Sequence, residues 1–287
     1  MKTLASGTVV NTAKANRILV LLFIINLFNY LDRFVLASVL EPVKADLKIV
    51  DDGDLGRLAT AFLFGYFLSS PFFGYLGDRF PRKYLMVFGI VGWSVGACLT
   101  AFAQDYRFML VCRVIVGLGE ASFSAIGPAV ISDTFPKEKR NSAMTFYLLA
   151  VPVGAALGYL LGGLISASSG WRSAFLWTGL PGFFLALLLL FFPMAKKGES
   201  DGFVHAAQAS VFQDIKALAF NKQYLVAVSG FVFHTFATGA FSFWGPTFLT
   251  RVHHLTQKQA TGFFGPMLIA VGIFATFAGG RIASAWQ

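Results

Sequence analysis

Charged residues are scarce in this sequence and make up 13% of its 287 residues, about half the share that is usual in a soluble domain. There are only two cysteines, which excludes a disulfide-stapled secreted fold. The sequence has neither a His-Glu-x-x-His motif nor a P-loop, two marks of enzymes. Hydrophobic residues reach 56%, with 33 phenylalanines, which excludes a disordered chain. The composition therefore indicates a polytopic membrane protein.

Long apolar runs divide the chain. A helix needs about 20 mostly apolar residues to cross a bilayer. The predicted spans are 18–40, 57–76, 84–103, 108–132, 142–165, 172–193, 223–249 and 261–283. We therefore predict an all-α polytopic membrane protein with an N-terminal segment 1–17, a six-helix bundle 18–193, a linker 194–222 and two further helices in 223–287. Apolar residues at helical spacing predict an amphipathic helix in the linker.

The net charge of +9 comes from lysines and arginines spread thinly between the apolar runs. This spread favours membrane orientation over nucleic-acid binding, so no nucleic-acid partner is expected. With the N-terminus in the cytoplasm, the inner loops hold more basic residues than the outer loops, and we expect that orientation. No cleavable signal peptide is expected, because the first apolar run is too long for one.

Four ionisable side chains lie inside predicted spans, where a charge is costly and indicates function. Asp32 and Arg33 are in the first span, and Arg113 and Glu120 are in the fourth. The latter two are seven residues apart and share a helix face, about 10 Å apart along the axis. The glycines between them, Gly117 among them, leave room for a ligand or another helix. The alternative is a pair of ion-paired residues that only holds helices together.

The first span has a polar side that also includes Asn29. Asp32 and Arg33 are adjacent and diverge by about 100° around the helix. They therefore cannot both face one partner, and we expect one to meet a cavity and the other a neighbouring helix.

The loop after the second span begins Gly-Tyr-Leu-Gly-Asp-Arg at Gly74 and continues through Arg82. The glycines Gly74 and Gly77 predict close helix contact. Asp78 is placed to accept hydrogen bonds or to pair with an arginine across a gate. A simple positively charged loop would explain the charges but not this spacing.

Two further spans carry patterned small or polar residues. In the fifth span, Gly154, Gly158 and Gly162 recur every four residues, which predicts a close helix interface. Pro152 in the same span predicts a kink. The seventh span pairs His234 with Thr238 and Thr235 with Ser242 on shared faces, and either a cavity or a helix contact would use them.

These motifs together resemble the major facilitator superfamily, and within it the spinster-like branch. The closer resemblance is carried by Asn29-Tyr-Leu-Asp-Arg-Phe34, by Gly117-Leu-Gly-Glu-Ala-Ser-Phe-Ser124, and by Phe146-Tyr147 with Pro152-Val-Gly154. It covers residues 25–193 well and the last two spans only in general character.

The resemblance implies a major facilitator fold, here the N-terminal six-helix bundle plus the first two helices of the second bundle. The last four helices of that fold are absent from the sequence, and we expect that eight spans do not suffice for transport. The implied function is secondary active, alternating-access transport of a lysophospholipid or sphingolipid-like amphiphile with proton coupling. The alternative is a carrier of a small polar solute, an organic anion or a sugar. No enzymatic activity is expected.

The resemblance also assigns roles to residues. The expected substrate-binding residues are Asn29, Arg33, Arg113 and Tyr147; the proton-coupling residues are Asp32 and Glu120; the gate residues are Gly74, Asp78, Arg79 and Arg82. No metal or cofactor is expected, and the expected partners are a lipid-like substrate, protons and the bilayer. We expect a monomer in a plasma membrane or a bacterial inner membrane.

Overall fold

The computed structural model of the chain describes residues 12–195, 197–201 and 217–285. Among these residues, eight helical segments are long and apolar enough to cross a membrane. The predicted all-α polytopic fold is thereby confirmed. The amphipathic helix predicted in the linker falls largely on residues outside the described ranges.

The helices follow one another with short connections. In chain order they are α1 (Thr12–Ser38), α2 (Leu40–Asp46), α3 (Asp52–Arg79), α4 (Arg82–Thr100), α5 (Tyr106–Thr134), α6 (Lys137–Leu148), α7 (Ala150–Ser169), α8 (Trp171–Phe191), the 3-10 turn η1 (Glu199–Asp201), α10 (Lys222–Val252) and α11 (Gln257–Ala285). Several begin at side-chain caps. Asp51 accepts a hydrogen bond from the Gly53 amide, and Asp105 accepts one from the Phe108 amide, as helix starts require.

Two features differ from the expected spans. The short helix α2 is not indicated by the hydropathy pattern; it is held because Leu40 and Val43 are fully buried. The third helix starts at Asp52 rather than 57, because the cap residue Asp51 adds a polar first turn that hydropathy does not register.

The fifth span is not one continuous helix but α6 followed by α7, with the break at Leu149. A proline clashes with the carbonyl group four residues before it and cannot donate a hydrogen bond to that group. For Pro152 that residue is Leu148, where α6 ends. The helix assignment is therefore interrupted at Leu149, three residues before the proline, although the backbone of Leu149 stays in the helical region.

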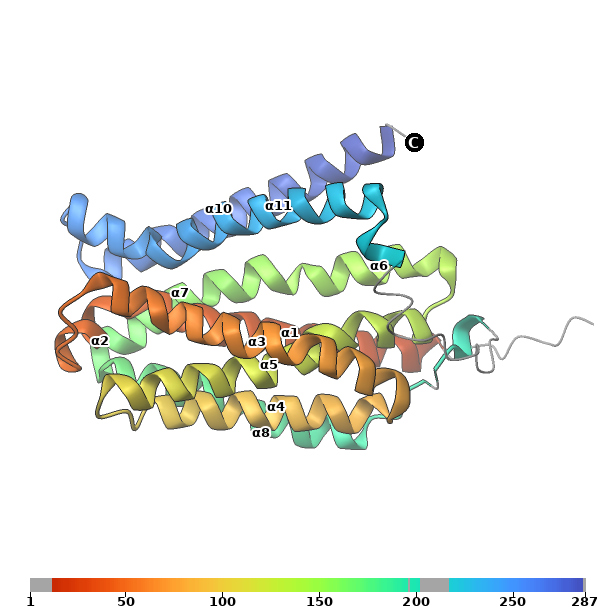
Figure 1. Ribbon diagram of the computed structural model, residues 1–287, viewed down its shortest axis with the longest axis horizontal. Coiled ribbons are helices and arrows are strands. Elements are labelled where there is room, and N and C mark those ends of the chain that lie inside the picture. Colours follow the sequence, from red (N-terminus) through yellow and green to blue (C-terminus); the bar gives the residue numbers. More distant parts are fainter. Residues whose placement is uncertain (1–11, 196, 202–216, 286–287) are drawn as a thin grey trace, which may run out of the picture.

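Six of the spans form one elongated bundle, and α10 and α11 lie along one side of it, where α11 packs on α7 and α10 contacts α1 (Figure 1). Within the bundle, α3 packs on α5, α1 on α7, and α4 on both α5 and α8. The predicted close interface of the fifth span is confirmed on α1. There Gly154 and Gly158 lie against the backbone carbonyl groups of Leu27 and Leu31.

Two hydrophobic clusters fill the bundle, one toward each end. One includes Leu22 and Met86, and the other includes Leu40 and Leu55. We call the two ends of the bundle the Arg82 end and the Asp52 end, after a residue that lies at each.

Candidate functional site

The centre of the bundle contains an ion pair between Arg33 on α1 and Glu120 on α5. Arg33 donates to Glu120 Oε2 from Nε at 2.9 Å and from Nη2 at 2.6 Å. The Glu120 side chain is fully buried, whereas that of Arg33 keeps 22% of its surface exposed. The guanidinium group also lies over three aromatic rings, which favours a cation there; they belong to Tyr30, Phe62 and Tyr66.

Asp32 points away from this pair and toward α8. Its Oδ1 accepts a hydrogen bond of 2.7 Å from the Thr178 hydroxyl group. Its Oδ2 is buried without a hydrogen-bond partner among the described residues. Adjacent residues of α1 therefore serve different neighbours, since Arg33 reaches α5 and Asp32 reaches α8. Thr178 is a contact that no sequence pattern indicated.

Arg113 on α5 is almost completely buried, with 1% of its surface exposed. Its Nε and Nη2 atoms have no hydrogen-bond partner in the described part of the chain. Its guanidinium carbon lies 5.5 Å from the centre of the Phe175 ring. Glu120 is bonded to Arg33 rather than to Arg113, although the latter shares its helix. A buried guanidinium group with unused donors is well suited to an anionic ligand.

A cavity of about 380 Å³ lies between α1, α3, α5 and α10. Both Arg33 and Arg113 line it. Most of the remaining wall is apolar or aromatic and includes Phe34, Leu36, Phe62, Leu63, Phe231 and Phe243. The cavity therefore combines two guanidinium groups with apolar walls. An amphiphile that has an anionic head meets both kinds of surface.

Helix α10 supplies the polar part of the opposite wall. The seventh-span residues that share faces in the sequence all line the cavity: His234, Thr235, Thr238 and Ser242. The Thr238 hydroxyl group donates to the His234 carbonyl group at 2.8 Å. The Tyr159 hydroxyl group on α7 donates to the Ser242 carbonyl group. Helix α10, which follows the linker, thus contributes to the same cavity as Arg33 and Arg113.

Two residues predicted to bind substrate do not line this cavity. Asn29 is fully buried, and neither its amide nitrogen nor its amide oxygen has a partner among the described residues. Tyr147 is 3% exposed and packs against Phe123. The structure therefore brings Arg33 and Arg113 to the cavity but leaves Asn29 and Tyr147 in the packed interior.

The family follows from comparison with known proteins. A family model described as Major Facilitator Superfamily matches residues 22–287. The chain belongs to the major facilitator superfamily. The members it matches are transporters rather than enzymes.

Individual members of the superfamily are similar over most of this chain. Protein spinster homolog 1 of Xenopus tropicalis is 38% identical over 249 residues, which cover 84% of this chain and 47% of that protein. The sphingosine-1-phosphate transporter SPNS2 of Danio rerio is 37% identical over 241 residues, covering 82% and 47%. The chain thus spans about half the length of the curated relatives it matches. The spinster-like resemblance of the motifs is confirmed.

A solved structure shares the fold. It is the crystal structure of a bacterial homologue of the human lysosomal transporter Spinster, in an inward-facing and unoccupied conformation. Its TM-score is 0.81 with 23% sequence identity, over 96% of this chain and 63% of that chain. The major facilitator fold is confirmed by this likeness.

At the Arg82 end of this superfamily member, the motif that begins at Gly74 contacts a residue that sequence reasoning missed. Arg82 pairs with Asp133 of α5 and also donates to the Gly77 carbonyl group at 3.3 Å. Asp133 also accepts a hydrogen bond of 3.0 Å from the Gly198 amide. It therefore joins the motif to the start of the linker. No pattern flagged Asp133, because one aspartate near a helix end is common.

The other residues of the motif differ in how closely they contact the rest of the bundle. Asp78 lies 3.6 Å from Arg82, and its side chain is 79% exposed. The Arg79 guanidinium lies over the Tyr75 ring at 4.2 Å. Gly77 contacts Ile126, as the predicted close helix contact requires, but a Cβ atom added at Gly74 would meet nothing within 4 Å. The predicted contact at Gly74 is therefore wrong in this conformation, since that side of α3 has no described neighbour.

The start of the linker also contains Lys197, whose amine has a shifted pKa. Lys197 is near Arg82, Asp78 and Asp133. Partial burial, together with the positive charge of Arg82, lowers the pKa of the Lys197 amine. The Lys197 side chain itself is exposed, and the linker start is held to the bundle by the hydrogen bond from the Gly198 amide to Asp133.

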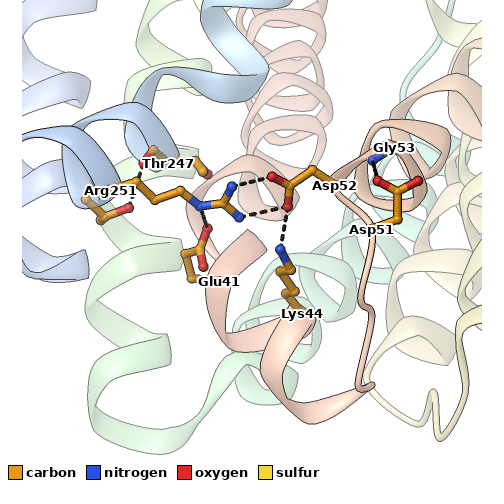
Figure 2. Close-up of polar contacts among 8 residues, drawn as sticks. Glu41, Lys44, Asp51, Asp52, Gly53, Thr247 and Arg251 are labelled. Atoms are coloured by element: carbon orange, nitrogen blue, oxygen red, sulfur yellow. Dashed lines mark hydrogen bonds and ion pairs between the residues drawn. The ribbon is translucent and has the colours of Figure 1, made fainter.

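At the Asp52 end, four charged residues join the two parts of the chain, and we call them the Arg251 cluster: Glu41, Lys44, Asp52 and Arg251 (Figure 2). Arg251 on α10 donates from Nε to Glu41 at 2.7 Å and from Nη1 and Nη2 to the two oxygens of Asp52 at 2.5 and 3.0 Å. Hydropathy could not indicate this cluster, because Arg251 lies 199 positions from Asp52 and 210 from Glu41 in the sequence.

A Gly-x-Ser-x-Gly pattern, which can mark a hydrolase nucleophile, is present at Gly92–Gly96. The structure places it in the middle of α4 rather than on a strand-to-helix turn. Ser94 is fully buried, and its hydroxyl group has no partner among the described residues. The site therefore lacks the exposed geometry that a nucleophile needs.

Proposed function

We propose that this protein transports an anionic amphiphile of the lysophospholipid or sphingolipid type by alternating access. The single observation that carries the proposal is the cavity in which Arg33 and Arg113 meet apolar and aromatic walls. Arg113 binds the anionic headgroup with its unused donors, while the apolar tail lies along the aromatic lining. The name of the SPNS2 relative from Danio rerio, a sphingosine-1-phosphate transporter, supports this substrate class.

Proton coupling is assigned to the two buried carboxylates. When Glu120 takes up a proton, its charge is lost and the attraction that holds Arg33 weakens. Arg33 then becomes available to the headgroup. Asp32 acts from the α8 side, where a proton on its carboxylate changes the hydrogen bond with Thr178. The motif residues Gly74, Asp78, Arg79 and Arg82 form the gate at the opposite end from the Arg251 cluster.

The orientation is proposed from the loop charges. A cytoplasmic N-terminus puts the Arg82 end inside the cell and the Asp52 end outside. We propose that the protein works as a monomer in a plasma membrane or a bacterial inner membrane.

Binding of a lysophospholipid to the purified chain tests the proposed substrate class. We expect saturable binding that Arg113→Met weakens by about 10- to 100-fold, since a hydrogen bond to a charged group contributes about 1.5–3 kcal/mol. Isothermal calorimetry in nanodiscs measures it. The matched control is Arg57→Met, because Arg57 is exposed, pairs with Asp54 and does not line the cavity.

Competition separates this proposal from the polar-solute alternative. An excess of a sugar or a short organic anion should leave the bound lysolipid in place. Displacement by such a solute, or equal lysolipid affinity in the wild type and Arg113→Met, would contradict the amphiphile proposal.

Glu120→Gln tests the coupling role separately from binding. Glutamine keeps the size and one acceptor oxygen but does not titrate, so we expect uptake driven by a pH gradient to fall to background while binding persists. Uptake of labelled lysolipid is measured in cells that express the full-length protein. Glu138→Gln is the control, because Glu138 lies on the exposed surface of α6. Full gradient-driven uptake by Glu120→Gln would exclude Glu120 as a coupling residue.

A further inference from the structure

The carboxylate of Asp52 is shared by two cations that come from different parts of the chain. Lys44 Nζ lies 2.5 Å from Asp52 Oδ1, and Arg251 Nη2 lies 3.0 Å from the same oxygen. Arg251 also reaches the second oxygen, so it holds Asp52 with a bidentate pair (Figure 2). Lys44 therefore competes with Arg251 for part of the same carboxylate.

The two cations are attached differently. Lys44 belongs to α2, which is fixed to the six-helix bundle by more than its connection to α1. Asp46 of α2 accepts hydrogen bonds from Arg172 at 2.5 Å and from the Trp171 indole at 3.3 Å. Arg251 belongs to α10, and its contact with Asp52 crosses 199 positions of sequence. If α10 moves away from the bundle, Arg251 leaves with it, whereas Lys44 stays beside Asp52.

This difference matters for the energy of opening. A carboxylate that loses one of its cations loses the Coulomb attraction of that pair, and this loss opposes opening. The side chains of Asp52 and Arg251 are 44% and 35% exposed, so each pair is of moderate strength. Lys44 keeps Asp52 paired in both arrangements and thereby reduces the cost of losing Arg251.

We propose that the Arg251 cluster is a latch that closes the Asp52 end, and that Lys44 is its release partner. Arg251 favours the closed arrangement through Glu41 and Asp52. Lys44 favours the open arrangement, because it takes over Asp52 when α10 departs. The inference rests on the proposed alternating-access function, which requires this end to open.

Spin labels that span the latch test the proposal. Val50 and Val252 are 92% and 56% exposed at the same end, and cysteines at these positions carry the labels. Double electron–electron resonance on the full-length protein in nanodiscs then gives the ratio of long to short distances. Arg251→Met is expected to raise this ratio, and Lys44→Met is expected to lower it, each by about two- to fivefold.

Two controls test whether the opposite changes in the distance ratio come from the pairing with Asp52. Lys48→Met removes an identical charge at the same end, and the Lys48 side chain has no hydrogen bond or ion pair among the described residues, so the ratio should stay unchanged. In an Asp52→Asn background, Lys44→Met should have no further effect, because the shared carboxylate is gone.

The possible outcomes distinguish a failure of the latch proposal from a failure of the proposed alternating access. The release role of Lys44 is overturned if Arg251→Met raises the ratio and Lys44→Met does not lower it. A ratio in Lys44→Met that rises, or that equals the Lys48→Met value, is such a result. A single short distance in every variant, Arg251→Met included, overturns the opening of this end and with it the proposed alternating access. Opposite shifts that disappear with Asp52→Asn support the latch.

Discussion

Glu120→Leu is expected to lower the free energy of unfolding by about 3–5 kcal/mol, since it removes one partner of a buried pair and leaves the other charged. Arg33 would then keep its guanidinium group beside three aromatic rings with no carboxylate to accept its two hydrogen bonds. Thermal unfolding of the purified protein in detergent measures the loss.

The double variant Arg33→Met with Glu120→Leu identifies the cause. Replacing both members of a buried pair with apolar residues of similar size is often neutral, so most of the lost stability should return. A double variant as unstable as Glu120→Leu alone would contradict this account and point to a packing defect at Glu120. Glu120→Gln should be milder than Glu120→Leu, because it retains an acceptor oxygen for Arg33.

Gly117→Ala is expected to destabilise the bundle by about 3 kcal/mol, at the upper end of what overpacking costs. A methyl group at Gly117 of α5 would overlap the carbonyl oxygen of Phe62 on α3 and lie 2.9 Å from the Tyr66 amide nitrogen. Both neighbours are backbone atoms, so no side-chain rotation relieves the overlap. Gly65 on α3 meets the Val114 carbonyl group in the same way, and the two helices therefore cross at glycines.

Gly74→Ala is the matched control for this prediction. It is the same exchange within an α-helix, on α3, but a Cβ atom there has nothing within 4 Å. Its effect should be neutral or stabilising by up to about 1 kcal/mol, the helix preference of alanine over glycine. Equal unfolding temperatures of Gly117→Ala and Gly74→Ala would show that α3 and α5 do not approach this closely.

Hydropathy and motif spacing were sufficient to predict the spans, the fold family and the ionisable interior. They could not predict the partners across helices. The sequence places Glu120 on one helix face with Arg113, yet its partner is Arg33, which lies 87 positions away. Helical periodicity relates residues of one helix only, while the packing of α1 on α5 decides which side chains meet.

The missed contacts share a physical reason. Thr178, Asp133 and Arg251 are single polar residues in or near apolar helices, and each gains its role from a partner on another helix. The misplaced contact at Gly74 is the converse. A glycine permits the close approach of another helix, but the contact forms only where a helix lies beside it. Gly77, one turn later, has such a neighbour in Ile126, whereas Gly74 does not.

The buried layer of Asp32, Arg33, Arg113 and Glu120 has an electrical consequence. With all four side chains ionised, their charges sum to zero, so a conformational change of the empty carrier moves no net charge from this layer through the membrane field. The field acts at about 2.3 kcal/mol per elementary charge per 100 mV, and it would therefore leave the empty step unaffected. In the proposed transport cycle, a monoanionic substrate that enters with one proton would preserve that balance, and the complete cycle would carry no current.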